Sequence, residues 1–201
     1  MKIGPKYKIA KRLGAPIFEK TQTQKFALSE ARQGRNRKRG KQASDYKRQL
    51  IEKQKMRFSY GITEKQLRRY VDEATAKSHQ PITVLMERLE MRLDNVVYRM
   101  GLAKTRRFAR QIVAHGHIFV NGKRIKVPSH RVNIGDNISV REQSKGSGLF
   151  TVLADTHDTV SVPAWLTFEV KKLAGSVTAL PVYQPAESMF DPEQVMEFYS
   201  R

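Results

Sequence analysis

The sequence predicts an α+β fold in which helices fill the first half of the chain and a small β-sheet follows them. Apolar residues recur at helical spacing from about residue 46 to residue 115, which is the pattern of amphipathic helices. Beyond that point Asn121-Gly122 lies between short alternating segments, and this dipeptide is the strongest short-range signal for a β-hairpin. The distribution of charge is the third observation, because it divides the chain into regions.

Charge is segregated along the 201 residues, whose formal net charge is +19. Residues 1–60 carry 18 Lys and Arg against four Asp and Glu, and residues 91–150 carry 12 against three. Residues 151–201 are acidic, with three against seven. Such segregation is typical of a protein with a polyanionic partner. A folded basic module beside a basic arm favours nucleic acid as that partner.

Residues 1–45 are predicted to form an extended basic arm with at most short helical turns, because glycines and prolines interrupt any long helical period. These are Gly4, Pro5, Gly14, Pro16, Gly34 and Gly40. The run from Arg35 to Lys41 is too charged to bury itself, and we expect it to be disordered in isolation. It could be a solvated tail, but Tyr7, Phe18 and Phe26 could pin the arm to a surface or stack on bases.

Residues 46–90 are predicted to form a helical subdomain of three helices. Asp45 is the candidate N-cap of the first, which we expect to end near Gly61. Thr63 and Gln66 form a capping box for the second. Its apolar stripe is Leu67, Tyr70, Val71 and Ala74. Pro81 separates it from a third helix that includes Leu85 and Leu89.

Residues 91–145 predict two short helices followed by a small sheet. The first helix carries Leu93, Val96 and Val97 on one face and stops at Gly101. Thr105 caps the second, which buries Phe108, Ile112 and Val113, exposes Arg106, Arg107 and Arg110, and ends at Gly116. The strands are expected around Ile118 and Val120, at residues 123–126 after the Asn-Gly turn, and from Ile138 to Val140.

Residues 146–201 predict a mixed acidic region. We expect a short helix at residues 149–154, a strand over residues 163–170, its pairing partner at residues 177–180, and a final helix opened by Asp191-Pro192.

Several classes of protein and site are disfavoured. The chain has no cysteine, which excludes disulfides, thiolate nucleophiles and cysteine zinc sites and fits a reducing compartment. No segment approaches the roughly 20 apolar residues of a membrane span, and the N-terminus has no apolar run of signal-peptide length. We expect no metal and no cofactor. His115 and His117 could form a metal pair, but the sequence places no other good ligand nearby.

Residues 91–123 resemble the S4 RNA-binding domain, on the strength of Met91-Arg92-Leu93-Asp94-Asn95-Val96-Val97-Tyr98-Arg99-Met100-Gly101, Thr105-Arg106-Arg107, Ala109-Arg110-Gln111 and His117-Ile118-Phe119-Val120-Asn121-Gly122-Lys123. The resemblance extends to the bacterial-type ribosomal protein S4 family through Gly4-Pro5-Lys6, the stretches 44–57 and 60–67, and Glu197-Phe198-Tyr199-Ser200-Arg201. Many members bind zinc through N-terminal cysteines. Tyr7 and Ala10 stand where the first two would be, so the chain resembles the zinc-free branch.

The resemblance implies a structural, non-enzymatic constituent of the small ribosomal subunit, in a cytoplasmic ribosome or an organellar one such as that of a chloroplast. It implies direct, early binding to small-subunit ribosomal RNA that nucleates assembly of the body. It also implies contact with ribosomal protein S5 and other small-subunit proteins, and a role in translational accuracy. Messenger RNA is a further partner that the resemblance allows. The candidate RNA contacts are Arg35, Arg37, Lys38, Arg39, Lys41, Tyr46, Arg48, Arg57, Arg92, Thr105, Arg106, Arg107, Arg110, His115, Asn121, Lys123, Arg124, Lys126 and Arg131.

Two alternative functions remain open. An RNA-modifying enzyme could use the same domain for targeting, and Arg92-Leu93-Asp94 resembles the catalytic stretch of pseudouridine synthases. Met91 and Val97 depart from that pattern, however, and residues 146–201 are too short for a catalytic domain. A polybasic membrane-surface protein would need a basic amphipathic helix with a lipid-facing side, which we do not find. Residues 34–42 do not form a phosphate loop, because the spacing is one residue too long and Gln42 replaces the Ser or Thr.

Overall fold

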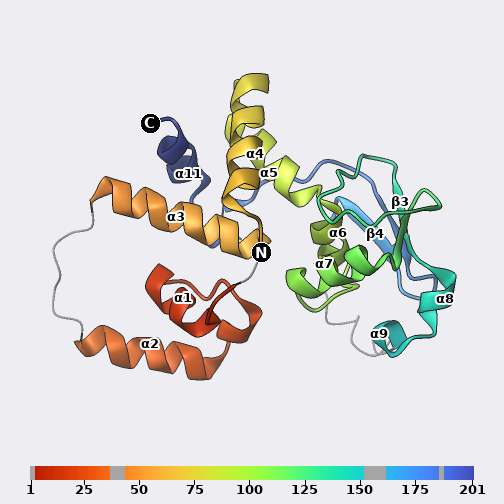
Figure 1. Ribbon diagram of the computed structural model, residues 1–201, viewed down its shortest axis with the longest axis horizontal. Coiled ribbons are helices and arrows are strands. Elements are labelled where there is room, and N and C mark those ends of the chain that lie inside the picture. The colour runs from red at the N-terminus through yellow and green to blue at the C-terminus, as the bar shows by residue number, and fades with distance from the viewer. Residues whose placement is uncertain (1–2, 37–43, 152–161, 186–187) are drawn as a thin grey trace. The chain divides into compact units, whose positions relative to one another are not determined.

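The computed structural model describes residues 3–36, 44–151, 162–185 and 188–201, and its elements divide between two compact units (Figure 1). The first unit comprises Met1–Ile82 and Gln184–Arg201, and the second comprises Thr83–Tyr183. Helices dominate the first unit, and the second combines helices with an antiparallel sheet. The predicted α+β class is confirmed.

The first unit is helical over the described residues. Its elements are α1 (Lys6–Leu13), the 3-10 helix η1 (Glu19–Thr21), α2 (Gln24–Asn36), α3 (Asp45–Tyr60), α4 (Glu64–Lys77) and α11 (Pro192–Tyr199), while α5 (Pro81–Glu90) runs on into the second unit. The capping box of Thr63 and Gln66 opens α4, and Gly61 closes α3 in a left-handed conformation, both as predicted. Asp45 is not the N-cap of α3. Ser44 has that role, its hydroxyl accepting from the backbone N–H of Lys47.

The N-terminal arm is not extended where it is described, so that part of the prediction is wrong. Gly14 ends α1 at φ 66° instead of preventing it, and α2 continues through Gly34. The physical reason is packing: Ala10, Leu13, Ile17, Phe18 and Phe26 are buried in one cluster with Ile51 and Phe58 of α3. Burial of an apolar face supplies most helical stability in proteins, and the sequence pattern did not identify that partner.

The C-terminal helix α11 packs on α3 (Figure 1). Asp191 caps it by accepting from the backbone N–H of Glu193, as the Asp-Pro pair predicted. Side-chain contacts then hold it: Gln49 donates to Glu197 at 2.9 Å, and Glu52 accepts from the Asp191 backbone N–H at 3.0 Å. The end of the chain thus returns to a helix about 140 residues earlier.

The second unit joins two short helices to a sheet. Its described residues form the helices α6 (Leu93–Arg99), α7 (Arg106–His115), α8 (Glu142–Lys145) and α9 (Gly148–Thr151). Its strands are β1 (Ile118–Val120), β2 (Lys123–Arg124), β3 (Asn137–Val140), β4 (Leu166–Glu169) and β5 (Ala174–Val177). Among the described residues they form one antiparallel sheet in the order β2-β1-β3-β5-β4. Among the described residues, its core includes Leu93, Val97, Ile112, Ile138 and Phe150.

The region predicted as one mixed acidic tail contributes to both units. Strands β4 and β5 extend the sheet because β5 pairs with β3, and α11 belongs to the first unit. Strand β5 lies three residues earlier than the predicted 177–180, so that Val177 opposes Leu166 and both are buried. The predicted helix over residues 149–154 is α9, and residues 152–154 lie outside the described part of the chain.

Candidate nucleic-acid interface

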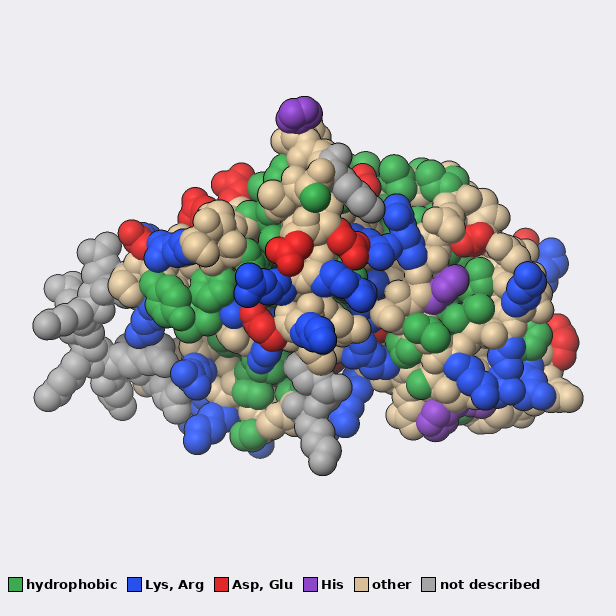
Figure 2. Space-filling model, turned by 45° about the horizontal axis from the view of Figure 1, so that its top comes forward, with side chains coloured by type: hydrophobic (Ala, Val, Ile, Leu, Met, Phe, Trp, Pro, Cys, Tyr) green, Lys and Arg blue, Asp and Glu red, His purple; other side chains and the backbone are tan. Residues whose placement is uncertain are grey.

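Basic side chains are prominent on the surface, and Figure 2 shows one group of them beside histidine side chains at the lower right. In the second unit, the exposed basic residues include Lys104 and Arg107 at the start of α7, and Lys123, Lys126 and Arg131 on and after the hairpin. Arg106 and Arg110 of α7, which the sequence predicted to be exposed, are half-buried. The candidate interface is therefore centred on α7.

Helix α7 presents its arginines because both ends and one face are fixed. Thr105 caps it, its hydroxyl accepting from the backbone N–H of Phe108 at 3.1 Å. Gly116 closes it at φ 74°. Ala109, Ile112 and Val113 are buried, so the opposite face carries Arg107 and Gln111 to solvent. A helix anchored in this way holds charged groups in a defined geometry.

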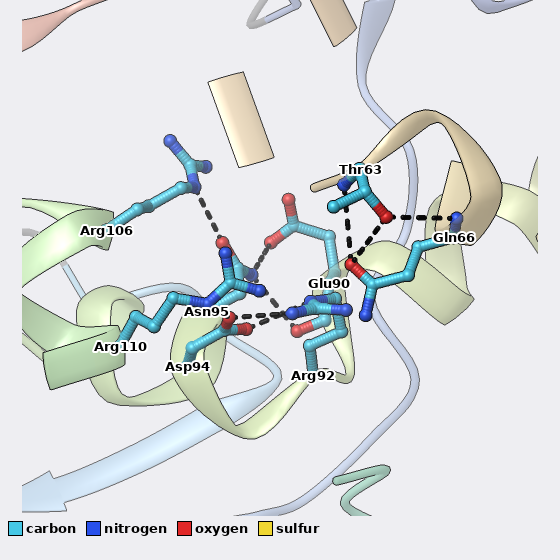
Figure 3. Close-up of polar contacts among 8 residues, drawn as sticks. All are labelled: Thr63, Gln66, Glu90, Arg92, Asp94, Asn95, Arg106 and Arg110. Atoms are coloured by element: carbon cyan, nitrogen blue, oxygen red, sulfur yellow. Dashed lines mark hydrogen bonds and ion pairs between the residues drawn. The ribbon is translucent and has the colours of Figure 1, made fainter. Parts of the chain in front are cut away.

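Below α7 lies a buried ion pair from the start of α6. Arg92 donates through Nε and one terminal nitrogen to both oxygens of Asp94, at 2.9 and 2.7 Å. Arg110 approaches the same carboxylate, with Nε 3.4 Å from Oδ2 (Figure 3). Arg92 and Asp94 are 2% and 4% exposed, which a paired, bidentate geometry permits.

A second series of hydrogen bonds, largely buried, connects Glu90 to Arg106 through Asn95. Asn95 donates through Nδ2 to the Glu90 carboxylate at 2.9 Å and to the Glu90 carbonyl at 3.0 Å. Its Oδ1 accepts from Nε of Arg106 at 2.8 Å (Figure 3). The guanidinium of Arg106 also lies over the ring of Tyr98, 4.5 Å from the centroid. Arg99 donates twice to Glu90, at 2.9 and 3.1 Å.

The hairpin brings further cations to the C-terminal end of α7. Asn121 and Gly122 take φ values of 50° and 76°, the left-handed pair that a tight hairpin turn requires. Arg124 donates to the carbonyl of Gly116 at 2.9 Å and to that of His115 at 3.0 Å. It thereby satisfies carbonyls that the helix leaves unbonded and complements the negative end of the helix dipole. Asn121 donates to Asp136 at 2.7 Å, which ties the turn to the loop before β3.

His117 anchors α8 and α9 beside this end of α7. Its Nδ1 lies 2.9 Å from the Ser144 hydroxyl, and its ring packs edge-on against Phe150. Burial, together with the charges of His115, Arg124 and Arg141, lowers the pKa of His117 below 6.5. Within the described residues, no third His, Asp or Glu joins His115 and His117 in a group that could hold a metal.

The predicted contacts between positions 91 and 131 lie in different environments. Arg107, His115, Lys123, Lys126 and Arg131 are exposed. Thr105 and Asn121 are used in the cap and the turn. Arg92 lies beneath the surface, and its burial removes it from the candidate interface.

The predicted residues outside this region belong to the first unit. Tyr46 is half exposed and packs on Phe198, and Arg48 pairs with Asp45. Arg57 lies 3.6 Å from Glu64 and over Phe58. Arg35 lies in α2, and Arg37, Lys38, Arg39 and Lys41 lie outside the described residues.

Sequence reasoning did not identify Glu90, Asn95 and Lys104 as parts of the site. Glu90 and Asn95 are buried polar residues flanking an apolar stripe, and a polar side chain at a buried helical position is the signal that could have revealed them. Lys104 is exposed immediately before the cap of α7. A cation preceding an N-cap carries no periodic signal of its own.

Comparison with known proteins identifies the family. An S4 domain matches residues 91–138, and the ribosomal protein S4/S9 N-terminal domain matches residues 1–91. The small ribosomal subunit protein uS4 of Persephonella marina is 42% identical over 200 residues, covering 98% of both chains. That of Chloroflexus aurantiacus is 42% identical over 203 residues, covering 99% of this chain and 98% of the relative. This chain belongs to the uS4 family of small ribosomal subunit proteins.

Membership of the uS4 family confirms the resemblance seen in the sequence, and it extends over both units. The uS4 protein of Geobacillus thermodenitrificans, at 40% identity over 201 residues, likewise covers 98% of each chain. The matched S4 domain contains α6, α7 and the β1–β2 hairpin, which are the elements that carry the basic surface. Among the described helices, none has the length and apolar character needed to span a membrane.

Proposed function

We propose that this protein is a structural constituent of the small ribosomal subunit that binds small-subunit ribosomal RNA through α7 and the β1–β2 hairpin. One observation carries the proposal: exposed cations are held on rigid elements at both ends of one short helix. Arg107 lies at the start of α7, Lys123 lies on the hairpin that Arg124 fastens to its end, and Lys126 follows that hairpin. The names of the uS4 relatives support the same assignment.

The surface suits recognition of folded RNA by backbone and shape. Arginine forks match phosphate geometry, and lysine supplies a point charge. Side chains do not enter the narrow major groove of A-form RNA, so proteins contact phosphates, 2′-hydroxyls and irregular junctions instead. The arginines and lysines on α7 and the hairpin fit contacts of this positioning kind. The basic residues of the arm, including those outside the described part of the chain, would add phosphate contacts.

The finer roles follow from the resemblance and are part of the proposal. We infer early binding that nucleates assembly of the body, contact with ribosomal protein S5, and a contribution to translational accuracy in a cytoplasmic or organellar ribosome. The acidic surface of α11, with Glu193 and Glu197 exposed, suits a protein neighbour better than RNA. Messenger RNA is a further candidate partner.

The proposed role is binding without catalysis. Asp94, at the position that resembles a pseudouridine synthase carboxylate, is buried and held by Arg92 and Arg110. A catalytic carboxylate has to reach its substrate, and this one serves as an ion-pair partner instead. Incubation of the protein with small-subunit RNA followed by mapping of uridine isomers tests this directly, and product formation would overturn it.

The triple variant Arg107→Ala, Lys123→Ala, Lys126→Ala tests the RNA-binding surface. All three side chains are exposed, so each substitution should change the free energy of unfolding by less than about 0.5 kcal/mol. Filter binding to a small-subunit RNA fragment should show weaker affinity. The slope of log affinity against log salt should fall by about 0.7–0.9 for each phosphate that the variant no longer neutralises.

The matched control is Lys171→Ala, Lys172→Ala, which removes exposed lysines on the β4–β5 turn. Lys172 forms a surface ion pair with Glu169, at 2.7 Å. The control should bind RNA as the unaltered protein does. An unchanged affinity and slope in the triple variant would overturn the proposed surface. Reconstitution of the subunit with each variant, followed by affinity capture of S5, tests the assembly and partner roles.

A further inference from the structure

Two arginines of α7 are held from below by neighbouring residues of α6. Nε of Arg106 is bonded to Asn95 at 2.8 Å, and Nε of Arg110 lies 3.4 Å from Asp94. Asn95 and Asp94 are adjacent in sequence, and each is less than 5% exposed. In Figure 3 both side chains rise from α6 toward arginines that arrive from α7.

Each of these two residues is itself fixed by a buried charge. Asn95 donates twice to Glu90, whose carboxylate also receives Arg99. Asp94 is gripped at both oxygens by Arg92. Because their other polar atoms are used, neither side chain can rotate without leaving a buried group unsatisfied, which costs more than the bond itself yields. They are therefore rigid supports.

Arg106 and Arg110 both make these contacts through Nε, which limits how each guanidinium can be oriented. A guanidinium is planar, so holding its Nε restricts the plane in which its two terminal nitrogens lie. For Arg106, the Tyr98 ring beneath the guanidinium restricts that plane further. The Tyr98 ring lies 4.5 Å under Arg106. An arginine on a flexible four-bond stem would otherwise lose rotamer entropy on binding.

We propose that Asn95 and Asp94 are positioning residues that orient Arg106 and Arg110 for RNA, so that specificity for a folded RNA depends on residues that do not touch it. The proposal rests on the proposed RNA-binding function. Asn95 gives the clearer case, because it is uncharged and its removal leaves the net charge of the surface unchanged. A loss of charge therefore cannot account for the effect of replacing it.

Asn95→Ala is the first test, with Arg106→Ala and the double variant completing a cycle. For a small-subunit RNA fragment, Asn95→Ala should weaken binding about tenfold, equivalent to about 1.4 kcal/mol. The salt slope should stay the same, as should affinity for a single-stranded homopolymer, because every cation is retained. Arg106→Ala should lower affinity for both RNAs and reduce the slope by about 0.7–0.9. In the Arg106→Ala background, Asn95→Ala should have no further effect on affinity.

Arg106→Lys keeps the charge and leaves the buried residues in place, so it tests the idea if Asn95→Ala does not fold. Lysine lacks both Nε–H and the planar fork, and it should reproduce the loss of specificity with an unchanged salt slope. The Nε–H resonance of Arg106 in the nitrogen-15 NMR spectrum should report ordering in the unaltered protein and loss of order in Asn95→Ala.

The outcomes separate the two proposals. Equal weakening by Asn95→Ala with and without Arg106, or equal weakening toward both RNAs, would make Asn95 a purely structural residue and overturn the positioning role. Full affinity in Arg106→Ala and in the triple surface variant would instead overturn RNA binding by this surface. If the unaltered protein binds RNA tightly and in a salt-dependent way, but the effects of Asn95→Ala and Arg106→Ala on affinity simply add in the double variant, RNA binding is supported. Only the positioning role of Asn95 is then overturned.

Discussion

At Gly116, both the backbone conformation and a neighbouring side chain require a residue without a Cβ. Its φ of 74° is costly for any residue with a Cβ. A Cβ built there would also lie 2.4 Å from Nε of Arg124, the group that satisfies the carbonyls at the end of α7. Gly122 has a nearly identical φ of 76° but no atom within 4 Å of its would-be Cβ. Comparing substitutions at Gly116 and Gly122 therefore separates the cost of backbone strain from the cost of a steric clash with Arg124.

We predict that Gly116→Ala destabilises the protein by about 2–3 kcal/mol and Gly122→Ala by about 1–2 kcal/mol. The shared part is the left-handed strain, of about 1–2 kcal/mol. The difference of about 1 kcal/mol is the displacement of Arg124 from its carbonyls. Urea unfolding of the two variants at neutral pH measures both. Equal losses would mean that Arg124 moves aside at no cost and does not cap the helix.

At the scale of elements, α11 also contacts the partly buried carboxylate of Glu64, which two hydrogen-bond donors share. Lys53 donates to Glu64 at 2.7 Å, and Tyr199 donates to the same oxygen at 2.7 Å. The ammonium of Lys53 also lies 4.2 Å from the centroid of the Phe198 ring. Partial burial tends to raise the pKa of Glu64, but the hydrogen bonds and the charges of Lys53 and Arg57 outweigh it and lower that pKa below 4.5. Burial and the same contact raise the pKa of Tyr199.

The sign of the pH dependence follows from that lowered pKa. The unfolded chain binds a proton at Glu64 more readily than the folded protein does, so the contribution is present above pH 4.5 and is lost as pH falls below it. We predict that Glu64→Gln lowers Tm near neutral pH and lessens the further fall in Tm below about pH 4.5. Calorimetry from neutral pH down to about one unit below that value provides the comparison. Parallel curves for the two proteins would rule out this coupling.

The N-terminal arm contributes both apolar residues to the core of the first unit and exposed positive charges. Different variants can remove these two contributions separately. Deleting residues 1–41 would uncover Ile51 and Phe58 of α3, which pack on the arm. We predict a lower stability of the first unit and a smaller salt slope for RNA binding. The control replaces the exposed Lys8, Arg12, Lys25 and Arg32 by Gln, which should reduce the slope and leave Tm nearly unchanged. A deletion that leaves Tm unaltered would show that the arm adds no core.

At the scale of the whole molecule, the arm is held by an apolar cluster that includes Ala10, Leu13 and Phe26. Ala10 is completely buried and Tyr7 packs on Phe26, their ring centroids 6.0 Å apart. These are the positions at which the resemblance places the first two cysteines of the zinc-binding members. A segment that folds only with zinc loses its structure to a chelator, whereas an apolar cluster does not.

We predict that a strong chelator changes neither Tm nor RNA affinity, and that purified protein contains no stoichiometric zinc by elemental analysis. The calorimetric scan with and without chelator checks the first, and mass spectrometry of the metal content checks the second. One tightly bound equivalent whose release unfolds the protein would contradict the zinc-free assignment. It would also direct attention to the five histidines.

The sequence by itself determined the features that depend on neighbours along the chain. The Thr63 and Thr105 caps, the Asn121-Gly122 turn and the Asp191 cap are all where local signals predicted them, because each involves residues within a few positions of one another. The charge segregation likewise needs no coordinates. Together with the motifs of residues 91–123, it located the basic surface of α7 and the hairpin.

Only the tertiary structure decided the features that depend on partners far apart in sequence. The arm is helical because its apolar cluster packs against Ile51 and Phe58 of α3. Helix α11 docks because Gln49, Lys53 and Glu64 contact it. Arg106 and Arg110 were predicted to be exposed but are half-buried, Arg106 being bonded to Asn95, and Arg92 is buried against Asp94. A linear pattern records the type of each side chain. The linear pattern does not show which buried group each side chain will bond to. Those pairings decide which arginines reach solvent and which are buried beneath them.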